Sequence, residues 1–141
     1  MLKIMMIGSL MMAITTAIHA SFMTAMMRLL ENRTRNQKDR APLTRLYVVV
    51  ESILMIFVAT LLEASAWAVA YLTLGAISGM EPALYFSVVT FTTVGYGDVV
   101  LTPEWRLLGS FEAVNGIIMF GWSTALVMAV VQRVYTSTMS R

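Results

Sequence analysis

Three long apolar segments set the limits on what this chain can fold into. They cover about residues 4–30, 43–74 and 105–134 and contain few charged side chains. A helix needs about 20 apolar residues to cross the hydrocarbon core of a bilayer, so each segment is long enough to span it. With 58% hydrophobic and 13% charged residues in a chain of 141, little remains for a soluble domain. The sequence therefore predicts an all-α membrane protein with three transmembrane helices.

The first apolar segment could instead be a cleaved signal peptide, because Lys3 precedes it and small residues surround Ala20. The apolar run, however, continues through Phe22 to Leu30, which is longer than the core of a typical signal peptide. Cleavage would also leave the basic loop that follows on the outside of the membrane. We therefore interpret residues 1–30 as an N-terminal transmembrane helix.

The basic residues predict the orientation of the chain. Six of the ten Lys and Arg residues lie in or beside a polar loop predicted at residues 31–42: Arg28, Arg33, Arg35, Lys38, Arg40 and Arg45. The positive-inside rule places this loop in the cytoplasm, with the N-terminus outside and the tail at 136–141 inside. We expect a multi-pass protein of the plasma membrane, and a bacterial inner membrane in view of its compactness. The same cluster could also bind anionic lipid headgroups.

A short helix is predicted between the second and third spans. Gly75 and Gly79 end the second apolar segment, and Pro82 with Glu81 suits the first turn of a new helix. A helix over residues 82–92 is too short to cross, so it must enter the membrane and return. The predicted pore domain at 43–135 thus comprises an outer helix at 43–75, this re-entrant helix, a loop at 93–98 and an inner helix at 105–135.

Composition argues against several other classes of function. The chain has no cysteine and one histidine, His19, so it lacks the residues of a disulfide framework or of a usual metal centre. No nucleophile and base occur in a catalytic pattern, and we expect neither an enzyme nor a cofactor. The net charge of +2 comes without a basic folded domain, so nucleic acid is not an expected partner.

The loop after the short helix carries the most specific motif, Thr93-Val94-Gly95-Tyr96-Gly97-Asp98. Here the sequence resembles the potassium channel family of the small pore-domain type, whose selectivity filter has the signature T-V-G-Y-G. The resemblance extends to an aromatic-rich pore helix and to Pro103 and Trp105 after the filter, and it covers about residues 43–135. The first span lies outside the minimal two-helix plan of that family.

The resemblance implies a function and a set of ion ligands. K⁺ would bind backbone carbonyls of Thr93, Val94, Gly95 and Tyr96, with Gly97 completing the filter. The physical reason is that a hydrated ion at membrane depth must exchange its water for other oxygens. Gly95 and Gly97 can adopt positive φ, which lets successive carbonyls face one axis. One chain supplies one quarter of the ring, so we expect a homotetramer whose partners are its own copies, lipid and permeant K⁺.

Other residues are candidates for supporting or gating this filter. The expected support residues are Asp98, Tyr85, Phe86, Thr92 and Glu112, with Tyr96 packed against Tyr85 or Phe86. The glutamate that the family commonly carries behind the filter is Val89 here, so we expect Glu112 to substitute and to bond hydroxyls such as that of Thr92, or a backbone N–H. Glu63 is expected to be protonated or bonded to another helix. Gly116 and Gly121 are candidate hinges, or sites of close helix packing, in the inner helix.

Two alternative functions remain open at this point. The replacement at Val89 allows a less selective cation channel of the same architecture. A non-conducting accessory subunit of a larger membrane complex would account for the extra first span. No helix carries the repeated arginines of a voltage sensor, so the sequence indicates no gating stimulus.

Overall fold

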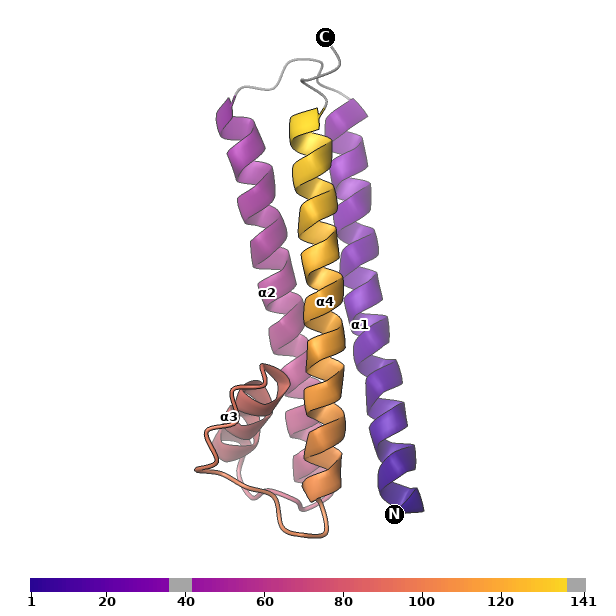
Figure 1. The fold of residues 1–141 in the computed structure, drawn as a ribbon, viewed down its shortest axis with the longest axis vertical. Coiled ribbons are helices and arrows are strands. Elements are labelled where there is room, and N and C mark those ends of the chain that lie inside the picture. Colours follow the sequence, from indigo (N-terminus) through magenta and orange to yellow (C-terminus); the bar gives the residue numbers. More distant parts are fainter. Residues whose placement is uncertain (36–41, 137–141) are drawn as a thin grey trace.

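The computed structural model describes residues 1–35 and 42–136, which form four helices. Three of them, α1 (Leu2–Arg35), α2 (Pro42–Thr73) and α4 (Arg106–Thr136), are long and apolar enough to cross a membrane. The fourth, α3 (Met80–Phe91), has only 12 residues and lies against α2 and α4 near one end of the bundle (Figure 1). The described part of the chain contains no strand, and the predicted fold class of three long helices with a short helix between the last two is confirmed.

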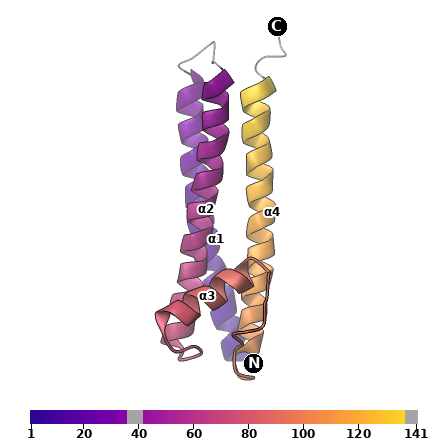
Figure 2. The same cartoon turned by 90° about the vertical axis from the view of Figure 1, so that its left-hand side faces the viewer.

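Successive long helices run in opposite directions along the bundle. The N-terminus lies at the end where α3 lies, and α4 finishes at the opposite end (Figures 1 and 2). This is the arrangement expected of three consecutive membrane spans. Most of the predicted basic loop and tail, at residues 36–41 and 137–141, lies outside the described residues.

The helix ends differ from the predicted ones for identifiable reasons. α1 continues to Arg35, five residues beyond its predicted end, because the apolar pattern marks the hydrocarbon boundary and the polar residues that follow include no glycine or proline. α2 ends at Thr73 because Gly75 adopts a φ of +66°. α3 begins two residues early because Gly79, at a φ of +94°, breaks the chain ahead of Met80.

The buried core lies at the end of the bundle where α3 packs on α2 and α4. Trp67 and Tyr71 of α2, Phe91 of α3 and Leu108 of α4 are fully buried there. A second apolar cluster holds α1, α2 and α4 together toward the other end of the bundle. The short helix is therefore fixed to the bundle by packing, which positions the loop that follows it.

α1 packs directly against α4 at the α3 end of the bundle. A Cβ on Gly8 would lie 2.7 Å from Cγ of Phe111, so only glycine allows this approach. The Lys3 ammonium lies 5.3 Å from the centre of the Trp105 ring, within the range of a cation–π interaction. The first span is therefore packed directly on the rest of the described chain.

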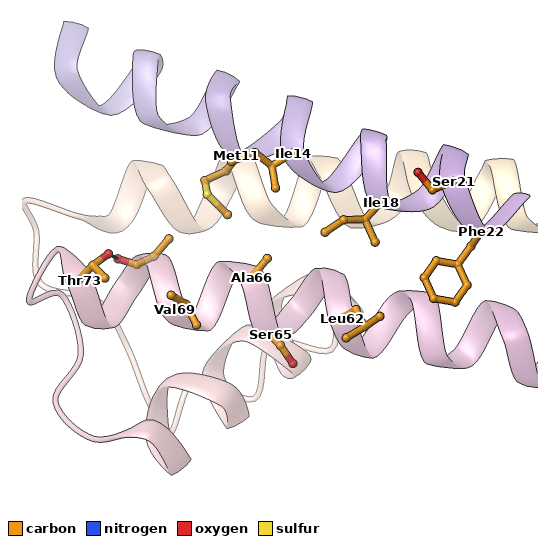
Figure 3. A pocket seen from close by; sticks show the side chains of 11 residues that line it. Met11, Ile14, Ile18, Ser21, Phe22, Leu62, Ser65, Ala66, Val69 and Thr73 are labelled. Carbon is orange, nitrogen blue, oxygen red and sulfur yellow. Dashed lines mark hydrogen bonds between the residues drawn. The ribbon is translucent and has the colours of Figure 1, made fainter. Parts of the chain in front are cut away.

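An apolar groove of about 730 Å³ separates α1 from α2 on another side of the bundle. Figure 3 shows side chains from both helices lining it, including Ile18, Phe22 and Leu62. The hydroxyls of Ser21 and Ser65 donate to carbonyls of their own helices, to Ala17 at 2.7 Å and Leu61 at 2.6 Å. The groove thus presents an apolar surface suited to lipid tails.

Candidate functional site

The short helix α3 carries the chain into the bundle and the following loop brings it back. Figure 2 shows α3 crossing obliquely from the side of α2 to the side of α4, after which the loop returns alongside α4. At the end of α3 the backbone N–H and the hydroxyl of Thr92 both donate to the carbonyl of Val88, at 3.0 and 2.7 Å. This predicted support residue therefore terminates the helix.

The backbone after Thr92 alternates in conformation. Thr93, Gly95 and Gly97 have positive φ values of 61°, 57° and 81°. Positive φ costs glycine little, but for a β-branched residue such as Thr93 it is a strained conformation, of the kind that persists at functional sites. A turn of the backbone at every second residue lets successive carbonyls point to the same side. The positive φ expected at Gly95 and Gly97 is therefore present, and Thr93 adopts it as well.

The N–H groups of this segment are directed back into α3. Thr93 donates to the carbonyl of Thr90 at 2.9 Å, and Val94 and Gly95 both donate to the carbonyl of Val89, at 3.0 and 3.2 Å. Within the described residues, no backbone hydrogen bond outside the helices ends on a carbonyl of residues 93–97. The donors at Thr93, Val94 and Gly95 are thus engaged, while the carbonyls of residues 93–97 accept none of these bonds.

The aromatic packing expected around Tyr96 is not found within one subunit. Tyr96 is 71% exposed, and the ring contacts of the described residues do not join it to Tyr85 or Phe86. The Phe86 ring instead packs edge-on against Tyr71, at 5.2 Å between ring centres. Tyr96 and the half-exposed Val94 thus both lie on an open face of the described chain.

Asp98 fastens the outer end of the loop to α3. The Tyr85 hydroxyl donates to Oδ2 of Asp98 at 2.7 Å, and the backbone N–H of Val99 donates to Oδ1 at 3.0 Å. The hydrogen bond from Tyr85 holds the pKa of Asp98 below its usual value, and the same bond raises the pKa of Tyr85. Asp98 and Tyr85 thus connect the loop to α3, and their support of an ion filter stays a prediction.

This bond gives a testable pH dependence. Because the pKa of Asp98 is lowered in the folded chain, its contribution to stability is complete above its unfolded pKa and is lost as pH falls through the lowered value. We expect Tyr85→Phe to raise the pKa of Asp98. Carboxyl NMR of aspartate-labelled protein measures it, and Tyr135→Phe, at the far end of α4, is the control. An Asp98 titration that Tyr85→Phe leaves unchanged would contradict the role of this bond.

A buried polar network joins α3 to the two helices of the pore domain. Tyr71 of α2 donates its hydroxyl to Oε2 of Glu112 in α4 at 2.6 Å. Ser87 of α3 lies 2.5 Å from Oε1 of Glu112 and 2.5 Å from the carbonyl of Ala64 in α2. All three side chains are fully buried. Glu112 thus binds the middle of the pore helix.

Glu112 bonds hydroxyl groups, as expected, but the example predicted from the sequence, Thr92, is not one of them. Thr92 uses its hydroxyl to bond its own helix, and the acid reaches Ser87 one turn earlier in α3. Ser87 and Tyr71 were not predicted as partners of Glu112, because hydroxyl side chains in apolar helices usually bond the backbone of their own helix. The indication present in the sequence was that an acid at membrane depth, Glu112, needs polar partners.

The two candidate hinge glycines have different surroundings. A Cβ on Gly116 would lie 1.8 Å from the carbonyl oxygen of Phe91, so α4 touches the end of α3 at this residue. A Cβ on Gly121 would meet nothing within 4 Å. Gly116 is thus a position of close helix packing immediately behind the loop, whereas Gly121 is open.

The chain matches the family model described as "Ion channel" over residues 56–133. This range includes most of α2, all of α3, the loop and most of α4, and it excludes α1. No curated protein and no solved structure matches the chain.

Proposed function

The chain belongs to the ion channel family whose model covers residues 56–133, and we propose from this that it is one subunit of a homotetrameric, potassium-selective channel. The membrane spans and the family agree on an ion channel in a membrane. The potassium selectivity, the tetramer and the orientation with an external N-terminus are our proposal. Conduction through such a pore is passive and makes or breaks no covalent bond.

The observation that carries the proposal is the division of backbone groups at residues 93–97. Their N–H groups at Thr93, Val94 and Gly95 are bonded to α3, while the carbonyls of the segment accept none of the described backbone bonds. A hydrated cation loses water at membrane depth only if other oxygens replace it. Carbonyls held by a fixed scaffold and free of internal partners supply those oxygens.

The open face of the loop supports assembly around a central axis. Irregular backbone at membrane depth is tolerated where it is buried in protein or lines water. In a single subunit the side chains of Val94 and Tyr96 are exposed, so neighbouring copies are needed to cover them. A cavity of about 290 Å³, lined by α2, α3 and Phe120 of α4, also opens beside α3. A neighbouring copy would fill this space in the tetramer.

The charges at the α3 end favour cations. Glu81, Asp98 and Glu104 lie there, together with Arg106 and Lys3, whose ammonium is over Trp105. The carbonyl end of α3 adds the negative end of a helix dipole deep in the bundle. Four copies of these features around one axis would concentrate cations at the pore.

The proposal is tested by ion flux from liposomes that contain only this chain. Gly95→Ala places a side chain at a φ of +57°, which costs about 1–2 kcal/mol and turns filter carbonyls away from the axis. We expect it to lower K⁺ flux by about tenfold or more, since each 1.4 kcal/mol in a barrier is a factor of ten.

Gly75→Ala is the matched control. Gly75 has a φ of +66° and, like Gly95, nothing within 4 Å of an added Cβ, but it lies outside the filter. It should carry the same backbone strain and keep K⁺ flux. Equal flux in the two variants, or no K⁺ flux from the unaltered protein, would refute the proposed function. Similar Na⁺ and K⁺ flux would favour the less selective channel, and a chain that does not form tetramers would favour an accessory subunit.

A further inference from the structure

α1 presents two buried polar side chains to the pore domain, although it lies outside the residues that match the ion channel family. Thr15 and His19, one helical turn apart, are both fully buried. Thr15 accepts a hydrogen bond from Nδ2 of Asn115 in α4 at 2.6 Å, and it donates to the carbonyl of Met11 in its own helix. The first span is therefore bonded to the inner helix as well as packed on it.

His19 joins all three long helices. Its Nδ1 lies 2.7 Å from Oε1 of Glu63 in α2, and its Nε2 lies 3.4 Å from the hydroxyl of Ser123 in α4. Its ring is also 5.1 Å from the ring of Trp122 in α4, measured between centres. His19 and Glu63 are both fully buried.

The number of protons on this pair decides its charge. With one proton shared between the imidazole and the carboxylate the pair is neutral overall, and without it the pair carries one negative charge. An uncompensated charge is expensive at membrane depth. Oε2 of Glu63 has no partner among the described residues, and neither does Nε1 of Trp67 one turn along α2. Gain or loss of one proton by the pair therefore sets the net charge of this buried site.

The groups that face His19 do not include the other buried acid, Glu112. α2 contributes the carboxyl group of Glu63. α4 contributes Ser123 and Trp122, whose side chains carry no charge at ordinary pH. Glu112 of α4 is engaged through both oxygens by Tyr71 and Ser87. The described titratable groups of the site are therefore His19 and Glu63 alone.

We propose that the His19–Glu63 pair is a proton-binding site that couples the packing of α1 on α4 to pH and so regulates conduction. The regulatory part rests on the proposed channel function, while the proton site does not. With the proton bound, the imidazolium donates from Nδ1 to Glu63 and from Nε2 to Ser123, and it lies against the Trp122 ring as a cation. When the proton leaves, Nε2 becomes an acceptor, the attraction to the carboxylate and the ring falls, and α1 is held less firmly to α4.

The proton site can be observed without measuring conduction, because His19 is the only histidine in the sequence. In protein labelled with ¹⁵N-histidine, we expect the ring nitrogen signals to change between about pH 5 and about pH 8, the range in which histidine side chains in general change charge. The fluorescence of Trp122 should change over the same pH range, since an imidazolium beside the indole alters its emission. This contribution is the difference between the spectra of the unaltered protein and of Trp122→Phe.

Glu63→Gln removes the negative partner and should shift this titration, whereas Glu104→Gln, at an exposed residue in the loop before α4, should not. Ring signals that stay constant across the range, or a titration that Glu63→Gln leaves unchanged, would overturn the proton site. The first of these tests uses only the unaltered protein, so it remains decisive even if a variant does not fold.

Conduction is then measured in the same liposomes across the same pH range. We expect K⁺ flux to change by about fivefold or more, the lower end of typical couplings between two sites, and the change to be lost in His19→Gln. An identical pH profile in His19→Gln would overturn the regulatory role. A protein whose His19 titrates but which passes no K⁺ at any pH would refute the channel function and leave the proton site supported.

Discussion

Gly116→Ala is expected to destabilise the subunit by at least about 3 kcal/mol, because the added Cβ would lie 1.8 Å from the carbonyl oxygen of Phe91. The clash is with backbone, so no side chain can rotate away to relieve it. Either α4 or the end of α3 must move, and the bonds from Val94 and Gly95 to the Val89 carbonyl depend on that end of α3. We therefore expect the variant to lose both thermal stability and K⁺ flux.

Gly121→Ala is the matched control for this prediction. It makes the same chemical change in the same helix, five residues along, where nothing lies within 4 Å of the new Cβ. Alanine favours a helix over glycine by about 1 kcal/mol, so stability should be kept or slightly raised. Thermal unfolding in detergent, followed by circular dichroism, compares the two. Equal Tm values would show that α4 does not depend on close approach at Gly116.

The membrane architecture could be predicted because it depends on properties that a sequence displays directly. The length of an apolar run decides whether a helix can span, and the short run before Thr93 could only enter and return. The conformation of the loop could be predicted in part because glycine at Gly95 and Gly97 indicates positive φ, which the structure has at both residues. These features are local, so neighbouring residues were enough to identify them.

The polar network around the loop could not be predicted in the same way. Ser87 lies 25 residues from Glu112, and His19 lies 44 residues from Glu63, so each pair depends on how two helices are rotated against each other. Each of these spans has apolar side chains on all of its faces, so its sequence does not specify which face packs against which helix. The sequence showed that the buried acids needed partners, but only the packed structure selects Ser87 and His19.

Glu112→Ala is expected to destabilise the protein by about 3–5 kcal/mol, combining a lost buried hydrogen-bond network with the cavity left by the side chain. The Tyr71 hydroxyl would be left buried without its acceptor, while Ser87 would keep the carbonyl of Ala64. Because Ser87 holds the middle of α3, we also expect the filter to be held less firmly. The ratio of K⁺ to Na⁺ flux from liposomes should then fall.

Glu112→Gln separates the hydrogen-bonding role of this residue from its charge. The glutamine oxygen can accept from Tyr71, its amide can donate to Ser87, and Ser87 can donate to Ala64, so each buried group keeps a partner. We expect this variant to recover most of the Tm and of the flux ratio that alanine loses. If Glu112→Ala unfolds at the same temperature as the unaltered protein and keeps its K⁺ to Na⁺ ratio, the acid does not support the filter. If glutamine is as damaging as alanine, the support depends on the ionisable group, because the shape and the hydrogen bonds would then have been preserved without effect.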